Sequence, residues 1–209
     1  MRSWSVVVPA KRLAVAKTRL RPLTATLGVA HGELVLALLA DTVRAAIDCP
    51  AVAEVVVVTD DPAAADVVRA LGARTVADVP DRGLNPALEH GARSAAGSAV
   101  AALSSDLPAL RPDELAAALD AALVVPRAFV ADADGTGTTL LTGVRTALSP
   151  RFGPGSAREH RAGGAVELTG SWPGLVRDVD TDADLRAAVA LGAGPRTTAL
   201  LDRLRAAGA

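Results

Sequence analysis

Short apolar runs that end in turn residues alternate with helix-like segments along most of this chain. Residues 5–8, 55–59 and 99–103 are rich in Val, Ala and Leu, and each run is followed by Pro, Asp or Ser, which is typical of buried strands. Residues 31–47 place leucines at helical spacing between two such runs. This alternation predicts an α/β protein with a mostly parallel sheet and helices on both faces. The functional groups are then expected at the carboxyl edge of the sheet.

The same periodicities place the remaining elements. The strands are expected at residues 5–8, 55–59, 74–76, 99–103, 128–131, 139–142, 165–168 and 175–179. The helices are expected at residues 31–47, 63–71, 86–96, 113–123, 182–191 and 197–206. Gly72 and Gly97 are expected to end two of the helices, and the strands after residue 132 are expected to add to the sheet in antiparallel fashion.

Composition narrows the class of protein. The 209 residues are expected to form one domain, 1–209. With 22 Lys and Arg against 23 Asp and Glu, the chain has no electrostatic footprint for a nucleic acid or an acidic membrane. Cys49 is the only cysteine, which excludes a disulfide within the chain and fits a reducing cytoplasm. No apolar stretch approaches the roughly 20 residues of a spanning helix, so a cytoplasmic protein is expected.

A cluster of cations follows the first expected strand. Its members are Lys11, Arg12, Lys17, Arg19 and Arg21. Because the chain as a whole is not basic, this cluster indicates a small polyanion such as a nucleoside triphosphate, whose phosphates suit both the planar fork of Arg and the point charge of Lys. The alternative is a solvated basic helix start, although cations there oppose the helix dipole.

Carboxylates end two of the expected strands. Asp106 follows the strand at 99–103, and Asp178 and Asp180 are two residues apart at the end of the strand expected at 175–179. Residues two apart in a strand face the same way, so this pair and Asp106 are expected to bind Mg²⁺ together with phosphate oxygens. The alternatives are structural: Asp106 caps the next helix, and Asp180 or Thr181 begins the helix at 182–191.

Two glycine-rich loops, residues 134–139 and 151–156, lie near these carboxylates in the expected sheet. Glycine lets backbone N–H groups approach an anion, and the Thr and Ser hydroxyls add donors; Ser156 can also cap residues 157–161. The G-x-G-x-x-G, P-loop and G-x-S-x-G motifs are absent. The three histidines, His31, His90 and His160, have no metal-ligand spacing and are interpreted as helix-surface residues.

In order along the chain, these motifs resemble the guanylyltransferases of coenzyme F420 biosynthesis, and most closely the branch that uses phosphoenolpyruvate. The matching segments are Pro9 to Lys11, Ala16 to Leu20, Gly83 to Asn85, Ser105 to Leu110, Gly135 to Thr138, Arg151 to Ser156, Val166 to Leu168 and Asp178 to Thr181. The resemblance implies a GT-A-like nucleotidyltransferase fold related to the Rossmann fold.

The resemblance also implies a role for each matching residue. Phosphoenolpyruvate would be held by Thr138, Gly153 and Ser156, and the metal ion by Asp106, Asp178 and Asp180. The phosphates of GTP would be held by Lys11, Lys17 and Arg19, of which Lys17 and Arg19 act in catalysis with Asp106, and the nucleoside by Asn85. The chain departs from the family at two positions: Ser105 replaces a glycine, and Asp134 adds a carboxylate that is expected to point away from phosphoenolpyruvate.

The reaction implied joins GTP and phosphoenolpyruvate to give enolpyruvoyl-diphospho-5′-guanosine and pyrophosphate, with Mg²⁺ as cofactor. The unstable product would be handed to the next enzyme of the pathway. The alternatives are transfer to 2-phospho-L-lactate or another phospho-acid, a different nucleotidyltransferase or GT-A glycosyltransferase, and a non-catalytic GTP-binding protein on the same fold.

Overall fold

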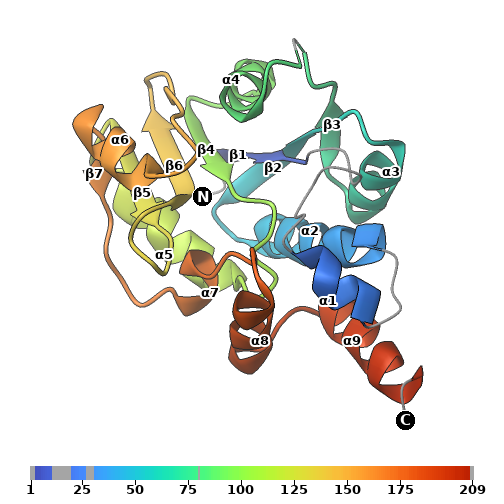
Figure 1. Ribbon diagram of the computed structural model, residues 1–209. Coiled ribbons are helices and arrows are strands. Elements are labelled where there is room, and N and C mark those ends of the chain that lie inside the picture. The colour runs from blue at the N-terminus through green and yellow to red at the C-terminus, as the bar shows by residue number, and fades with distance from the viewer. Residues whose placement is uncertain (1–2, 11–19, 27–30, 80, 208–209) are drawn as a thin grey trace.

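The computed structural model describes residues 3–10, 20–26, 31–79 and 81–207 (Figure 1). The strands are β1 (Trp4–Pro9), β2 (Val52–Val58), β3 (Arg74–Val76), β4 (Ala99–Leu103), β5 (Arg127–Ala131), β6 (Thr138–Val144) and β7 (Val166–Glu167). The helices are α1 (Arg21–Thr26), α2 (His31–Asp48), α3 (Pro62–Leu71), α4 (Leu84–Ser94), α5 (Pro112–Ala122), α6 (Ser156–Ala162), α7 (Pro173–Val176), α8 (Asp182–Leu191) and α9 (Pro195–Ala207).

The strands of the described residues form one seven-stranded sheet in the order β3-β2-β1-β4-β6-β5-β7. Strands β1 to β4 are parallel, and β6 runs antiparallel to both of its neighbours, β4 and β5. The mostly parallel sheet expected from the sequence is therefore confirmed. Because β6 is reversed, its first residue, Thr138, lies at the same edge as the carboxyl ends of β4 and β5.

Alternate residues of the strands pack in different hydrophobic cores, because successive side chains along a strand point to opposite faces of the sheet. Val6 and Val8 pack with α2, α3 and α5, whereas Val7 packs with α4 and α6 on the other face (Figure 1). Helix α4 lies close to the sheet at Gly91, where a Cβ atom would stand 2.5 Å from Val7 and 2.7 Å from Val58. The expected helices on both faces are confirmed.

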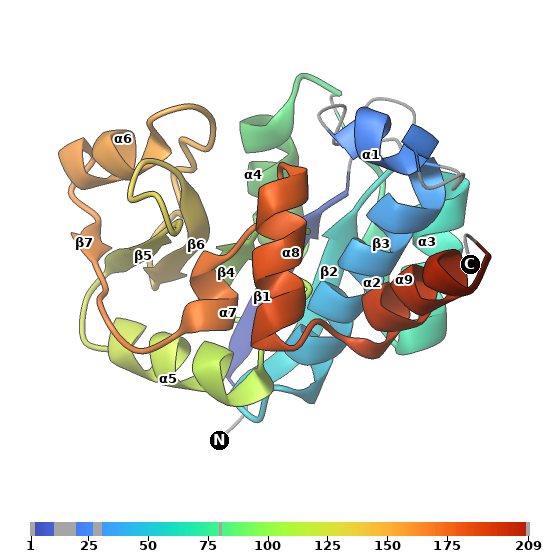
Figure 2. The ribbon, with the colours of Figure 1, turned by 60° about the horizontal axis from the view of Figure 1, so that its bottom comes forward.

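A third core joins α2 to α8 and α9; in Figure 2, α9 lies in front of α2 and α8 lies beside it. Asp41 of α2 anchors the start of α9: its carboxylate accepts hydrogen bonds from the backbone N–H groups of Arg196 (3.0 Å) and Thr197 (2.8 Å). The first N–H groups of a helix lack partners within the helix. A side chain from a distant helix therefore performs the capping that a local residue usually provides.

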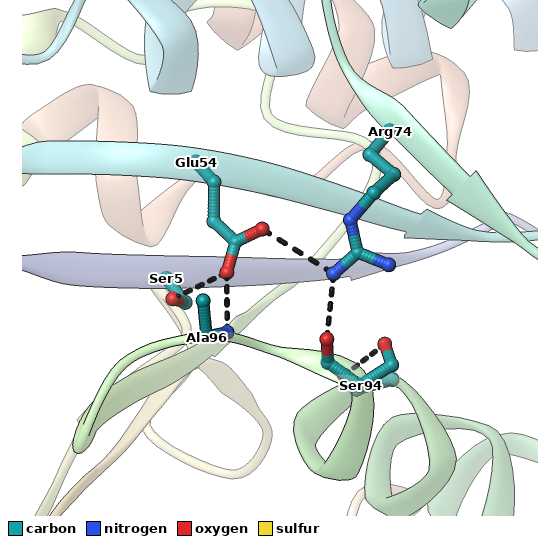
Figure 3. Close-up of polar contacts among 6 residues, drawn as sticks. Ser5, Glu54, Arg74, Ser94 and Ala96 are labelled. Carbon is teal, nitrogen blue, oxygen red and sulfur yellow. Dashed lines mark hydrogen bonds and ion pairs between the residues drawn. The ribbon is translucent and has the colours of Figure 1, made fainter.

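At the amino-terminal edge of the sheet, Glu54 of β2 ties its neighbours together (Figure 3). Its carboxylate accepts hydrogen bonds from the Ser5 hydroxyl (2.8 Å), the Ala96 backbone N–H (2.7 Å) and Arg74 (3.3 Å). Burial by itself raises the pKa of Glu54, but these hydrogen bonds and the charge of Arg74 together hold the pKa below its ordinary value. This network fixes the edge opposite the one where function is expected.

The expectation of a strand at residues 175–179 is wrong. Helix α7 occupies residues 173–176, because Pro173 favours a helix start and the N–H groups of Leu175 and Val176 both donate to the Trp172 carbonyl. The β-branched residues Val176 and Val179 suggested a strand, but local proline geometry prevails over that preference.

Three smaller expectations are also corrected. Helix α4 ends at Ser94 with Ala95 as its C-cap, so Gly97 does not end it, whereas Gly72 does end α3 in the left-handed conformation. Strand β7 runs parallel to β5, although β6 is antiparallel as expected. Helix α5 begins at Pro112 with Arg111 as its N-cap, so Asp106 does not cap it. None of the described helices is long and apolar enough to cross a membrane.

Candidate active site

A cavity of about 640 Å³ opens at the carboxyl edge of the sheet. Leu38 of α2 and Leu88 of α4 contribute apolar lining, and the loops after β4 and β5 contribute polar lining. Six of the residues expected in the site line this one cavity, namely Asp106, Thr138, Gly153, Ser156, Asp178 and Asp180. The metal-binding and acceptor-binding groups inferred from the sequence are therefore brought together by the fold.

The remaining expected residues stand apart. Lys11, Arg12, Lys17 and Arg19 lie outside the described residues, so their roles stay predictions; Arg21 begins α1 and is exposed. Asn85 is not among the cavity-lining residues. Its carboxamide pairs with the Phe152 backbone, donating from Nδ2 to the carbonyl (3.1 Å) and accepting at Oδ1 from the N–H (2.8 Å). Asn85 thus holds the 151–156 loop in place, and its role toward the nucleoside stays a prediction.

The loop that carries Asp106 is held by three backbone contacts. The Leu107 N–H donates to the buried Thr42 hydroxyl (2.9 Å), which itself donates to the Leu38 carbonyl. The Asp106 carbonyl accepts from the Val179 N–H (3.1 Å), and the Pro108 carbonyl accepts from the Gly194 N–H (2.7 Å). Helix α2 and the segments on either side of α8 therefore fix the position of the Asp106 carboxylate.

Asp178 and Asp180 reach the cavity by a route that differs from the one expected. They do not lie on a strand, so their two-residue spacing does not set their direction; they flank the fully buried Val179 in the loop before α8. Thr181 begins α8 with a capping box, in which its hydroxyl accepts from the Asp184 N–H and the Asp184 carboxylate accepts from the Thr181 N–H. This confirms the alternative of Thr181 as the helix start.

The cavity is strongly acidic within the described residues. Five carboxylates line it, those of Asp106, Asp132, Asp134, Asp178 and Asp180. Asp134 lies in an exposed loop at the cavity, and its expected direction away from phosphoenolpyruvate stays a prediction. Among the described residues, no three His, Cys, Asp or Glu side chains form a ready-made metal cage. Mg²⁺ does not need one, because it takes one or two carboxylates together with water and substrate phosphates.

The 132–137 loop is closed on itself around Asp132. Its carboxylate accepts from the N–H groups of Thr136 (2.9 Å) and Gly137 (2.7 Å), and its carbonyl accepts from the Gly135 N–H (3.0 Å). The expectation that this loop offers backbone N–H groups to an anion is therefore wrong. The sequence contained the signal, since an aspartate before a Gly-Thr run favours such a turn.

The 151–156 loop, in contrast, keeps backbone donors available. Gly153 and Gly155 have φ angles of 138° and 72°, which favour glycine. Their N–H groups make no hydrogen bond to any residue in the described part of the chain. Both line the cavity, so this loop can present two N–H groups to an anionic oxygen.

The hydroxyls beside this loop belong to a buried network that the sequence did not reveal. Ser156 is the first residue of α6, and Gly155 occupies the N-cap position, so Ser156 does not cap the helix. The Ser156 hydroxyl donates to Thr138 Oγ1 (3.2 Å), which also contacts His160 Nδ1 (2.9 Å). His160 is only 2 % exposed, so its interpretation as a helix-surface residue is wrong.

Comparison with known proteins identifies the family. The family model described as "Guanylyl transferase CofC like" matches residues 4–207. The chain belongs to this family. A CofC-like relative in Geodermatophilus obscurus, named phosphoenolpyruvate guanylyltransferase, is 71 % identical over 96 % of this chain and 95 % of its own length. A relative of the same name in Salinispora arenicola is 54 % identical over 94 % and 92 % of the two chains.

Solved structures agree with the CofC-like assignment. A nucleotidyl transferase from Methanothermobacter thermautotroptrophicus superposes with a TM-score of 0.67 at 26 % identity, covering 91 % of this chain and 98 % of that chain. A protein of Desulfovibrio desulfuricans classed as a nucleotide-diphospho-sugar transferase gives a TM-score of 0.71 at 17 % identity over 98 % and 97 %. The nucleotidyltransferase fold expected from the sequence is confirmed.

Proposed function

We propose that this CofC-like protein is a phosphoenolpyruvate guanylyltransferase of coenzyme F420 biosynthesis. It joins GTP and phosphoenolpyruvate to give enolpyruvoyl-diphospho-5′-guanosine and pyrophosphate. The observation that carries the proposal is the 71 % identity, over nearly the whole of both chains, to a relative of that name. The cavity supports it, because carboxylates and anion donors line the same space.

The transfer needs one bond to form and one to break. A phosphate oxygen of phosphoenolpyruvate attacks the α-phosphorus of GTP, and the bond from that phosphorus to the β-phosphate bridging oxygen breaks to release pyrophosphate. The attacking oxygen is already ionised, so no general base is required, and catalysis rests on positioning and on charge stabilisation. Thr138, Ser156 and the N–H groups of Gly153 and Gly155 hold the acceptor, and Lys17 and Arg19 offset charge on the departing pyrophosphate.

Asp106, Asp178 and Asp180 would hold Mg²⁺. The donor set fits, because hard carboxylate oxygens are the ligands that Mg²⁺ prefers. When bound, Mg²⁺ would supply positive charge that neutralises phosphate oxygens and draws the two anions together. Without cations, five carboxylates would repel a triphosphate and a phospho-acid from this cavity.

Pyrophosphate release tests the proposal. The protein is incubated with GTP, Mg²⁺ and phosphoenolpyruvate, and the guanylylated product is identified by mass; ATP, CTP and UTP serve as alternative donors. We expect release with GTP and phosphoenolpyruvate together and none when either is omitted. GTP binding without pyrophosphate release, for any phospho-acid tried, would instead identify a non-catalytic binding protein. Handover of the product to the next enzyme and a location in the cytoplasm remain predictions.

A further inference from the structure

His160 is held in one orientation beneath the anion-binding side of the cavity. Its Nε2 accepts a hydrogen bond from the Arg151 backbone N–H (2.9 Å), and its Nδ1 lies 2.9 Å from Thr138 Oγ1. The rings of Phe129 and Phe152 pack around it with centroid distances of 5.9 and 5.2 Å. The ring therefore has a fixed partner at each nitrogen and no room to turn.

These contacts dictate where the imidazole proton lies. A backbone N–H can only donate, so Nε2 must be the unprotonated nitrogen. The neutral ring then carries its proton on Nδ1, and that N–H donates to Thr138 Oγ1. Burial, helped by the nearby charge of Arg151, lowers the pKa of His160 to about 4, so the ring is neutral near pH 7.

The remaining protons can then be assigned. Thr138 and Ser156 together have two hydroxyl protons, and one of them lies in the 3.2 Å hydrogen bond between the two oxygens. The other cannot point at His160, because Nδ1 already donates there. Thr138 and Ser156 both line the cavity, so the second proton is available to a ligand.

We propose that His160 is a positioning residue that fixes the Thr138–Ser156 hydroxyl pair as a hydrogen-bond donor toward an ionised oxygen of the acceptor substrate. This rests on the proposed function only for the identity of that acceptor. The Thr138 oxygen already accepts from His160 and from Ser156, so it has no lone pair left for a ligand hydroxyl. Thr138 can therefore only donate to a ligand, and a charged phosphate or carboxylate oxygen accepts such a proton more strongly than a hydroxyl oxygen does.

The tautomer gives a test that needs no activity. Long-range ¹H–¹⁵N spectra of the ring nitrogens distinguish protonated from unprotonated positions, and the chain has only three histidines, so loss of one signal set in His160→Asn assigns His160. We expect Nδ1 protonated and Nε2 unprotonated at pH 7. The opposite tautomer, or a charged ring, would overturn the proposal.

Kinetics with two amide variants separate positioning from packing. In His160→Asn the amide nitrogen can replace Nδ1 as donor to Thr138, whereas in His160→Gln the amide reaches the Nε2 position and leaves Thr138 without its donor. We expect His160→Gln to raise KM for phosphoenolpyruvate about tenfold or more, as for a weakened hydrogen bond to a charged group, and to leave KM for GTP unchanged. The KM of His160→Asn for phosphoenolpyruvate should be closer to that of the wild type. His90→Gln, on α4 outside the lining residues, is the matched control.

The outcomes distinguish the two proposals. If both His160 variants change KM for phosphoenolpyruvate equally, or if both leave it unchanged while remaining folded, His160 does not direct the hydroxyl pair. If wild-type protein transfers no guanylyl group, the proposed function fails, but the tautomer measurement still decides the role of His160. Competition by inorganic phosphate and by pyruvate shows which oxygen is bound. If His160→Gln weakens inhibition by phosphate, the hydroxyl pair binds the phosphate group; if it weakens inhibition by pyruvate, the pair binds the carboxylate. No effect on either inhibitor contradicts the proposal.

Discussion

The backbone N–H of Val179 donates a 3.1 Å hydrogen bond to the carbonyl oxygen of Asp106. Val179 is fully buried and packs in the same core as Ala109. The segment that carries Asp178 and Asp180 is therefore joined through its backbone to the loop that carries Asp106. The positions of Asp106 and of the Asp178–Asp180 segment are therefore fixed relative to one another, although no strand pairing connects them.

Asp106→Asn is expected to abolish guanylyl transfer while leaving the fold intact. The substitution keeps the shape but removes the charge that would bind Mg²⁺. It also removes one of the five carboxylates that line the cavity, so the repulsion among them falls in the folded state. Pyrophosphate release and thermal melting measure the two effects. Asp120→Asn, an exposed change on α5, is the control, and full activity of Asp106→Asn would refute the metal-binding role.

Thr42→Val is expected to lower both stability and activity, although Thr42 does not line the cavity. The valine leaves the buried Leu107 N–H without its acceptor, which costs about 1–3 kcal/mol, and it frees the loop that positions Asp106. Thr42→Ser keeps the hydroxyl and should restore most of both properties. Chemical denaturation and kcat are the measurements. Equal activity in the valine and serine variants would show that this contact does not position Asp106.

Replacing Lys17 or Arg19 with Ala is expected to reduce the rate by roughly 10²-fold or more, comparable to the loss of a donor that stabilises transition-state charge. If these side chains contact GTP and not the protein core, the melting temperature without GTP should barely change, because substitutions outside the core usually stay within about 0.5 kcal/mol. Arg93→Ala, an exposed position at the end of α4, controls for a general loss of positive charge. Unchanged rates in both variants would favour a solvated basic segment.

Phosphoenolpyruvate is expected to be preferred over 2-phospho-L-lactate without excluding it. Both carry a phosphate and a carboxylate, and they differ in a planar enol carbon against a tetrahedral carbon with a methyl group. A shape difference of this size gives about 10–200-fold discrimination in an apolar pocket. Equal concentrations of the two acids compete for GTP, and the products are separated by mass. A majority of the 2-phospho-L-lactate product would leave the enzyme class intact but overturn the substrate.

Stability is expected to fall as the pH drops from 6.5 toward 4, in part because of His160. Its pKa of about 4 in the folded protein lies below the ordinary 6.5, so the unfolded chain binds the proton more readily in this window. This contribution to stability is complete above pH 6.5 and is at most roughly 3.5 kcal/mol, at about 1.4 kcal/mol per pKa unit. Thermal melts at pH 7 and 4.5 should show a smaller loss for His160→Asn than for wild type. An equal loss would contradict this origin.

The sequence predicted the elements whose pattern is local. The valine run of β2, the leucine spacing of α2 and the Gly72 end of α3 each follow from their own residues. The resemblance of short motifs also located six residues that meet in the cavity. The strand expected at 175–179 failed because Pro173 organises its neighbours into a helical turn, a preference that two β-branched residues could not outweigh.

Contacts between distant segments could not be predicted in this way. Nothing in the sequence around Asp41 indicates that it caps α9, because its partners are Arg196 and Thr197. The burial of His160 likewise depends on Phe129 and Phe152, which approach it only in the folded sheet. Spacing along the chain identifies candidate groups, whereas their partners are determined by topology.

The insertion of β6 between β4 and β5 has a consequence for the order of events during folding. One edge of β4 stays unpaired until residues 138–144 are available. The residues that line the cavity extend along the chain from Pro9 to Asp180. A nucleotide that binds there, as proposed, would stabilise only the completely assembled sheet, by mass action. In a nascent chain in which β6 has not yet been synthesised, β4 has an unpaired, apolar edge, which is a template for aggregation.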